Sequence, residues 1–95
     1  MAESTEVIHH PKQTHFVVQI GSDIAHLDYT LKGSVIDMHH TFVPPALRGK
    51  NIAGQLAKAA FDFAREQQLQ VIPSCSYIAR YAERYPEAGK LIDKS

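Results

Sequence analysis

The sequence has a single cysteine, no tryptophan and no apolar run long enough to cross a bilayer. One cysteine excludes an intramolecular disulfide framework, and it leaves either a reduced structural thiol or a reactive one. The first residues, MAESTEVIHH, lack the charged start and the hydrophobic middle of a secretory signal. We therefore expect a cytoplasmic protein without a membrane partner.

An excess of charge of either sign is also missing. Lys plus Arg and Asp plus Glu both number ten, so the formal net charge is zero. This balance argues against a nucleic-acid partner bound through a large basic surface, and a phosphate site would have to be local. The 95 residues leave room for one domain with one modest core. We expect residues 1–12 to be loosely ordered and residues 13–95 to form that domain.

Period-two alternation of apolar residues predicts three strands, at residues 14–20, 24–31 and 35–43. The turns Gly21-Ser22-Asp23 and Lys32-Gly33-Ser34 join them. Short turns of this kind connect neighbouring strands that run in opposite directions, so the three strands should form an antiparallel meander.

The pattern changes to helical spacing after Pro44 and Pro45, which cannot continue a strand ladder and therefore end the third strand. An amphipathic helix is expected from about residue 51 to 67, followed by a short strand at 69–73 and a second helix at 76–85. We thus predict an α+β fold: the antiparallel meander, a helix, a strand parallel to the third strand, and a C-terminal helix.

The segment FVPPALRGKNIAG, residues 42–54, joins the third strand to the first helix. Such a loop presents unpaired backbone N–H groups at the positive end of the helix dipole, where anions bind. Small residues (Gly49, Ala53 and Gly54) allow close approach, and Arg48 and Lys50 add positive charge. The alternative is that Gly49 only serves the turn and that the basic pair is solvated.

The stretch VPPALRGKNIAGQL resembles the acetyl-coenzyme A loop of the GNAT superfamily of N-acetyltransferases, whose signature is Gln or Arg, two residues, Gly, one residue, then Gly or Ala. Arg48 takes the first position and Ala53 the last, while Asn51 stands where the family prefers glycine. Asparagine tolerates a positive φ and its amide could donate to a phosphate, so weakened rather than abolished binding is expected. Residues 73–75, Pro-Ser-Cys, match the Pro-x-Cys of the small single-domain branch of the superfamily.

The resemblance implies a minimal GNAT-like fold and acetyl-coenzyme A as cofactor. It implies that backbone groups near Phe42 and Val43 contact the pantetheine arm. The loop that it assigns to the pyrophosphate consists of Arg48, Gly49, Lys50, Asn51, Ile52, Ala53 and Gly54.

The activity implied is N-acetyl transfer to an amine. So short a chain has few residues left for an acceptor pocket, and the acceptor is therefore either a protein amine or a small molecule that lies mostly outside the domain. Two other readings stay open: a coenzyme A-binding sensor or interaction module without turnover, and an interaction domain whose turn is purely structural.

Cys75 falls between a strand end and the expected start of a helix, where the helix dipole can favour the thiolate. It is therefore a candidate nucleophile that would form an acetyl-Cys75 intermediate. Direct attack of the amine on the thioester, with backbone donors near the third strand polarising the carbonyl, is the alternative route. A lone cysteine can also be a small buried hydrophobe.

Two further residue types could take part in proton transfer. Strict alternation places His40 on one side of the third strand with Ile36, Met38 and Phe42. His40 is thus either a hydrogen-bonded core histidine or a base that accepts a proton from the amine or from Cys75.

His39 falls on the other side of that strand, with Asp37 and Thr41, and is the lesser candidate. Because His39 and His40 are adjacent on a strand they cannot chelate one ion together, and no metal site is expected. Tyr77, Tyr81 and Tyr85 recur at helical spacing, which usually means packing. The resemblance makes Tyr77 a candidate to protonate the leaving thiolate.

Overall fold

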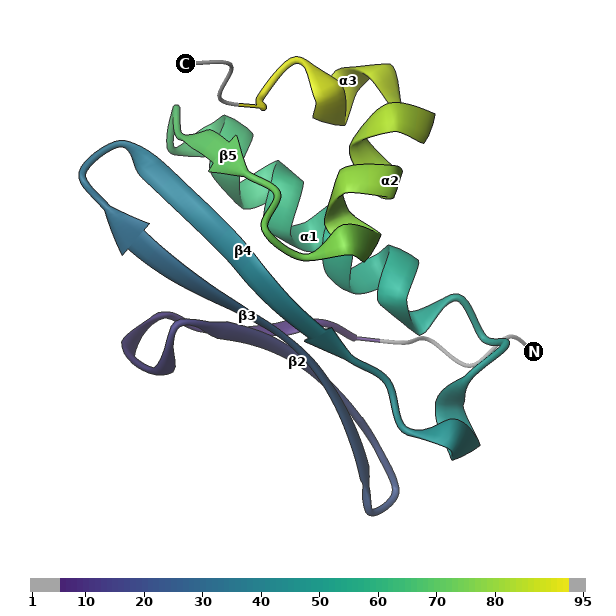
Figure 1. Ribbon diagram of the computed structural model, residues 1–95. Helices are drawn as coiled ribbons and strands as arrows, with labels where there is room; N and C mark the ends of the chain where they lie inside the picture. The colour runs from purple at the N-terminus through teal and green to yellow at the C-terminus, as the bar shows by residue number, and fades with distance from the viewer. Residues whose placement is uncertain (1–5, 93–95) are drawn as a thin grey trace.

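The computed structural model describes residues 6–92, which form one five-stranded sheet with helices packed on one side of it (Figure 1). The predicted α+β fold is confirmed, as is the order of its main elements. The strands are β1 (Ile8–His10), β2 (His15–Ile20), β3 (Asp23–Lys32), β4 (Val35–Phe42) and β5 (Gln70–Ile72). The helices are α1 (Ile52–Glu66), α2 (Ser76–Arg84) and α3 (Pro86–Gly89), with short 3-10 turns η1 (Pro11–Gln13) and η2 (Pro45–Leu47).

The strands lie in the order β1-β2-β3-β4-β5. Neighbours from β1 to β4 are antiparallel, and β5 pairs with β4 in parallel, as the sequence predicted. The parallel pairing covers only Val35↔Gln70 to Asp37↔Ile72, while β4 continues to Phe42. The pairing thus uses the whole of β5, and β4 continues beyond it (Figure 1).

The core lies between the sheet and α1, whose apolar face packs on β2, β3, β4 and β5. Leu27, Ile36 and Met38 from the sheet meet Leu56 and Ala60 from the helix, and all five are fully buried. Burying each large aliphatic side chain contributes about 1.5–3 kcal/mol. None of the helices within residues 6–92 combines the length and the apolar character that a membrane span requires.

A β-bulge in β4 changes which face its last residues occupy. Asp28 pairs with His40, but the next residue, Tyr29, pairs with Met38, so His39 is an extra residue in the ladder. Beyond the bulge, Thr41 lies opposite the buried Leu27. Thr41 is thus on the inner face of the sheet.

The prediction that His40 and Phe42 share the face of Ile36 and Met38 is therefore wrong. The extra residue moves both side chains to the outer face, where His40 is exposed and Phe42 is 40% exposed. A single inserted residue reverses every side chain that follows it, because the side-chain period of a strand is two.

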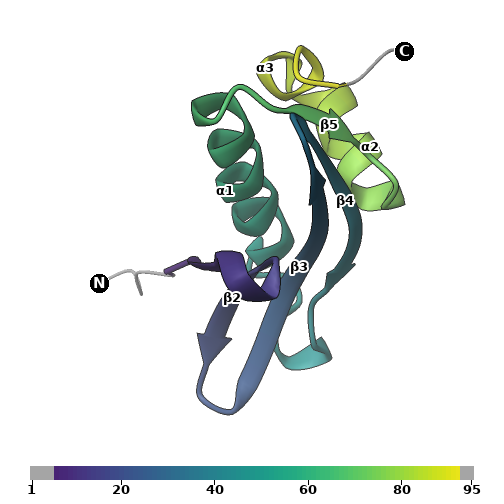
Figure 2. The ribbon, with the colours of Figure 1, turned by 90° about the vertical axis from the view of Figure 1, so that its left-hand side faces the viewer.

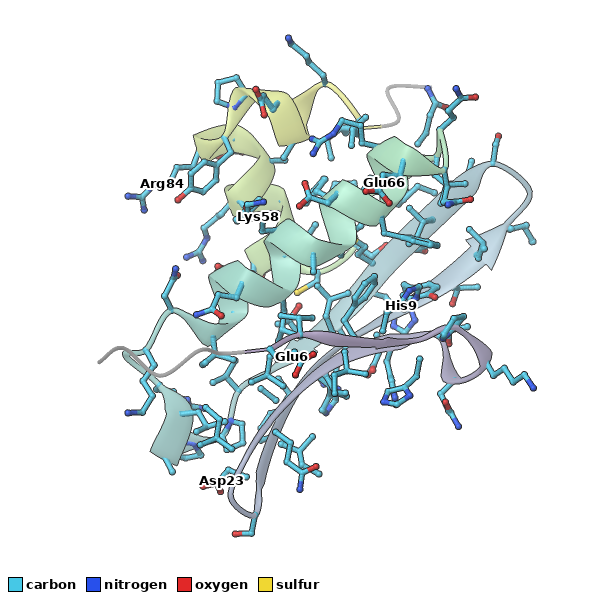
Figure 3. The ribbon with its side chains drawn as sticks, turned by 180° about the vertical axis from the view of Figure 1, so that it is seen from behind. Glu6, His9, Asp23, Lys58, Glu66 and Arg84 are labelled. Carbon is cyan, nitrogen blue, oxygen red and sulfur yellow. The ribbon has the colours of Figure 1, made fainter. Side chains whose placement is uncertain are left out.

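The expectation of a loosely ordered segment at residues 1–12 is also wrong where the structure describes it; residues 1–5 lie outside the described part. Ile8–His10 form β1 on the edge of the sheet. The His9 side chain points from β1 toward α1 (Figure 3). Its ring stacks on Phe16 at 4.1 Å between centroids. Its Nε2 is 2.6 Å from the Tyr29 hydroxyl. Aromatic stacking and this hydrogen bond hold the strand in place.

We expect His9 to make stability depend on pH. Burial, together with the neighbouring His10 and His15, lowers the pKa of His9 below its ordinary value of 6.5. The unfolded chain therefore takes up the proton first, so the stability that His9 contributes above about pH 6.5 is lost as the pH falls below that value. His9→Phe keeps a ring on Phe16 and cannot titrate. It should flatten the fall in the free energy of unfolding between pH 7.5 and 5, at a cost of about 1 kcal/mol at pH 7.5 for the lost hydrogen bond.

Urea unfolding at a series of pH values measures this dependence. His39→Gln, which changes an exposed histidine on β4, is the matched control and should keep the wild-type slope. If the free energy of unfolding fell equally with pH in the wild type and in His9→Phe, His9 would not be the cause of the lower stability at acid pH.

Candidate active site

The pairing of β5 with β4 ends at Asp37↔Ile72, and the edge of β4 that continues beyond it without a strand partner in the described chain is called the gap. After Asp37↔Ile72 the chain of β5 turns away through Pro73, and α2 begins at Ser76. The Cys75 N–H donates to the Met38 carbonyl at 3.0 Å, which ties the start of α2 to β4 at the bulge. Within the described residues, no strand pairs with this edge of β4 beyond that bond.

Cys75 and Thr41 meet across this gap. The Cys75 thiol donates to the Thr41 hydroxyl oxygen at an Sγ–Oγ1 distance of 3.6 Å, although the two residues are 34 positions apart. Cys75 is partly buried and packs against the core. Sequence alternation placed Thr41 on the outer face, so this partner of Cys75 was missed, and only the register of β3 with β4 reveals it.

The surroundings of Cys75 favour its thiolate. Burial alone would raise the pKa of the thiol. The Thr41 hydroxyl, which can donate to the sulfur once it is deprotonated, and the backbone N–H groups of Ile78, Tyr77 and Thr41 stabilise the charged form and lower the pKa. The pKa of Cys75 therefore lies below its ordinary value. Because a thiolate is the reactive form of cysteine, the lowered pKa makes this sulfur a better nucleophile candidate than an ordinary cysteine thiol.

We expect Thr41→Val to make Cys75 less reactive, because valine has the shape of threonine but cannot hydrogen-bond the sulfur. The pKa of Cys75 should rise, and its rate of alkylation by iodoacetamide at neutral pH should fall by up to about tenfold for a rise of one unit. Mass spectrometry over time measures the rate. Thr30→Val, on the exposed part of β3, is the control. An unchanged pH profile of alkylation in Thr41→Val would remove Thr41 from the site.

The loop between β4 and α1 leads from the end of β4 to the start of α1 (Figure 2). Its backbone takes the left-handed conformation at Gly49, with φ of 85°, and at Asn51, with φ of 59°. The expectation that asparagine would accept a positive φ at this position is confirmed. The Arg48 Nε–H donates to the Val43 carbonyl at 3.1 Å, so the guanidinium lies between the end of β4 and the loop.

The first turn of α1 leaves backbone donors free within the helix. The Gln55 N–H donates to the Asn51 carbonyl at 3.1 Å as the first helical bond. The N–H groups of Ile52, Ala53 and Gly54 therefore have no helical acceptor. They lie at the positive end of the dipole of a 15-residue helix.

Two hollows border this loop. The smaller, of about 410 Å³, is lined by Val43, Leu47, Arg48, Gly49, Asn51, Ile52, Ala53, Gly54 and Tyr77. The larger, of about 570 Å³, lies between α1 and α2, with Lys58 and Arg84 among its lining residues (Figure 3). Asn51, Gly54 and Tyr77 line both, so the two hollows adjoin.

Tyr77 lies at the junction of the two hollows, two residues after Cys75. Burial, and then the nearby Tyr85, raise the pKa of the Tyr77 hydroxyl, so it stays protonated at neutral pH. Tyr81 packs against α1, because its ring stacks on that of Phe61 at 5.5 Å between centroids. Among the three tyrosines of α2 and its end, Tyr77 is the one beside Cys75.

Most of the predicted site residues lie on the inner side of the sheet, but His40 does not. Val43, Tyr77 and six residues of the loop (Arg48, Gly49, Asn51, Ile52, Ala53 and Gly54) line the smaller hollow. Cys75 and Lys50 are not among its lining residues, and Cys75 lies two residues before Tyr77. His40 lies on the opposite face of the sheet, with its ring beside that of His26, so the predicted pairing of His40 with Cys75 is wrong. Phe42 also points outward, which leaves only its backbone on the side of the gap.

Comparison with known proteins agrees with this architecture. A family profile described as GCN5-related N-acetyl-transferase matches residues 15–91. Protein NATD1 of Gallus gallus is 40% identical over 84 residues, which is 85% of this chain and 76% of that protein. Protein NATD1 of Homo sapiens is 40% identical over 83 residues, covering 84% and 74%. The NMR structure of a GCN5-like protein from Staphylococcus aureus superposes with a TM-score of 0.74 and 24% identity, over 94% of this chain and 88% of that one.

Proposed function

This chain belongs to the GCN5-related N-acetyltransferase family, and we propose that it binds acetyl-coenzyme A and transfers the acetyl group to an amine. The observation that carries the proposal is the contact of Cys75 with Thr41 beside β4, two residues before Tyr77, which lines the hollow at a loop with free backbone donors. A reactive sulfur next to an anion-binding helix start suits a ligand with a thioester at one end and phosphates at the other.

The residues present fit such a ligand. The left-handed backbone at Gly49 and Asn51 turns the loop so that the free N–H groups of α1 face the smaller hollow. Arg48 and Lys50 would supply charge to the pyrophosphate. The edge of β4 near Val43 would hold the pantetheine arm, and the basic residues Lys58 and Arg84 beside the larger hollow suit the remaining phosphate.

Acetyl-coenzyme A, when bound, supplies an acetyl group activated as a thioester. The Thr41 N–H, which helps to lower the pKa of Cys75, would stabilise the negative charge that develops on the carbonyl oxygen. In the covalent route, the Cys75 thiolate would attack the carbonyl carbon, the bond from that carbon to the leaving sulfur would break, and the Tyr77 hydroxyl would protonate that sulfur. The amine would then attack the acetyl carbon on Cys75, the bond to the Cys75 sulfur would break to restore the thiolate, and the proton of the amine would pass to the Tyr77 oxygen. In the direct route, the amine attacks and Cys75 only lines the site.

The acceptor has little protein around it. Apart from the strands, the described chain has only the helices α1, α2 and α3 and two 3-10 turns. We therefore propose that the amine belongs to a protein or to a small molecule that lies mostly outside the domain.

A coenzyme A-binding module without turnover is the second candidate. The observation in its favour is the side chain of Asn51, which lies over Gly54 so closely that a Cβ at residue 54 would collide with it. This amide partly covers the start of α1, where a glycine would leave it open. A sensor needs only the binding residues, whereas a transferase also needs Cys75 or the backbone donor of Thr41.

Release of coenzyme A thiol from acetyl-coenzyme A, followed with and without a panel of amines and lysine peptides, separates the two candidates. A transferase should release thiol faster when an acceptor amine is added, and the acceptor should gain one acetyl group by mass spectrometry. Binding without any release or acetylated product supports the module. Absence of binding overturns both.

A further inference from the structure

The helices α1 and α2 lie on one side of the sheet (Figure 1), and the strand register places a row of histidine and aspartate residues on the other, outer face. The strand register pairs His15 on β2 with Asp28 on β3, and Asp28 with His40 on β4. His26 lies two residues before Asp28 and therefore on the same face. Three strands thus bring four ligand-type side chains to one place.

The distances within this row are short. The nearest ligand atoms of His26, Asp28 and His40 all lie within 4.8 Å of one another. His26 Nδ1 is 3.1 Å from the Asp28 Oδ1, and His15 Nδ1 is 3.9 Å from the same oxygen. His15 and His26 are each 30% exposed and Asp28 is 29% exposed. The cluster is therefore open to an ion from solvent while its backbone is fixed in the sheet.

Nothing in the acetyl-transfer site uses these groups. Thr41 and Cys75 lie on the inner face, and the bulge at His39 is what separates Thr41 from His40 across the sheet. The histidines that matter are not adjacent in the sequence, and the bulge is what aligns His40 with Asp28. The cluster could therefore not be predicted from residues that are adjacent in the sequence.

We propose that His26, Asp28 and His40 form a binding site for a divalent transition-metal ion of the zinc class, with His15 as the fourth ligand. Imidazole nitrogen with one carboxylate oxygen is a ligand set that zinc accepts in tetrahedral geometry. At metal–ligand distances of about 2.0–2.1 Å, the ligand atoms lie roughly 3.4 Å apart, so rotations of exposed side chains suffice to close the site. The ion would link β2, β3 and β4.

Isothermal titration of the untagged full chain with ZnCl₂ tests the proposal. One equivalent should bind, and Zn²⁺ should raise the melting temperature because it binds the folded chain. His26→Gln and His40→Gln should each weaken binding by at least about tenfold. His39→Gln removes the adjacent exposed histidine outside the cluster and should bind as the wild type does. Cys75→Ala should also bind one equivalent, which rules out the thiol.

A second readout needs no substitution. Adding Co²⁺ to the wild type should shift or broaden the imidazole NMR signals of His26 and His40 far more than those of His9 and His39. No saturable binding of Zn²⁺, unchanged binding in His26→Gln and His40→Gln, or an equal loss in His39→Gln would each overturn the site. So would Co²⁺ effects centred on Cys75.

Discussion

Arg48→Glu is expected to weaken the binding of acetyl-coenzyme A about 10- to 100-fold. Charge-assisted hydrogen bonds to phosphate are among the stronger polar contacts, at about 1.5–3 kcal/mol, and each 1.4 kcal/mol is tenfold in affinity. The substitution also places a negative charge beside the free N–H groups at the start of α1. Because the loss is mainly electrostatic, the difference from the wild type should shrink when the salt concentration is raised.

Lys32→Glu is the matched control for this measurement. Lys32 is exposed at the end of β3 beside the turn that leads to β4, and its reversal changes the net charge by the same amount. Titration calorimetry of both variants at two salt concentrations gives the comparison. Equal affinity of Arg48→Glu and the wild type would remove Arg48 from the site, and equal losses in both variants would point to net charge alone.

Cys75→Ala is expected to abolish a covalent acetyl adduct while leaving coenzyme A binding nearly intact. Incubation of the wild type with acetyl-coenzyme A should add one acetyl group, which peptide mapping places on Cys75 and which saturating coenzyme A prevents. The side chain contacts Thr41 and does not line the hollow at the loop proposed to bind the phosphates, so its truncation should not weaken those contacts. Cys75→Ser is less informative, since a hydroxyl is a poorer nucleophile that can still hydrogen-bond.

The Cys75→Ala variant distinguishes the covalent route from direct attack of the amine. No adduct on the wild type, together with undiminished transfer by Cys75→Ala, would contradict the covalent route and leave direct attack of the amine. The surroundings of Cys75 at Thr41 and the start of α2 favour the thiolate, so rapid alkylation is expected. Alkylation at the slow rate of a buried thiol would therefore also contradict the covalent route.

Local patterns in the sequence predicted most of the fold. Alternation at period two located β2, β3 and the first half of β4, and helical spacing located α1 and α2. These patterns are local consequences of one buried face, so a single sequence carries them. The left-handed Asn51 was also predictable, because few other residues accept that conformation without strain.

Features that depend on distant pairing could not be predicted. β1 has only three residues, and the one that faces α1 is a histidine, so no apolar alternation marks it. The bulge at His39 leaves no trace in the alternation, yet it moves Thr41 to Cys75 and His40 to Asp28. The inner site and the outer cluster therefore both rest on the register of β3 with β4.

The measurement that tests the central claim most directly is a ¹H–¹⁵N NMR titration of the full chain with acetyl-coenzyme A. We expect the largest shifts at the backbone amides of Val43, of Arg48 to Gly54 and of Thr41, and little change along β2 and the turn between β2 and β3. No saturable change, or changes gathered on the outer face of the sheet around His26 and His40, would contradict the assignment of the loop and the gap beside β4 as the cofactor site.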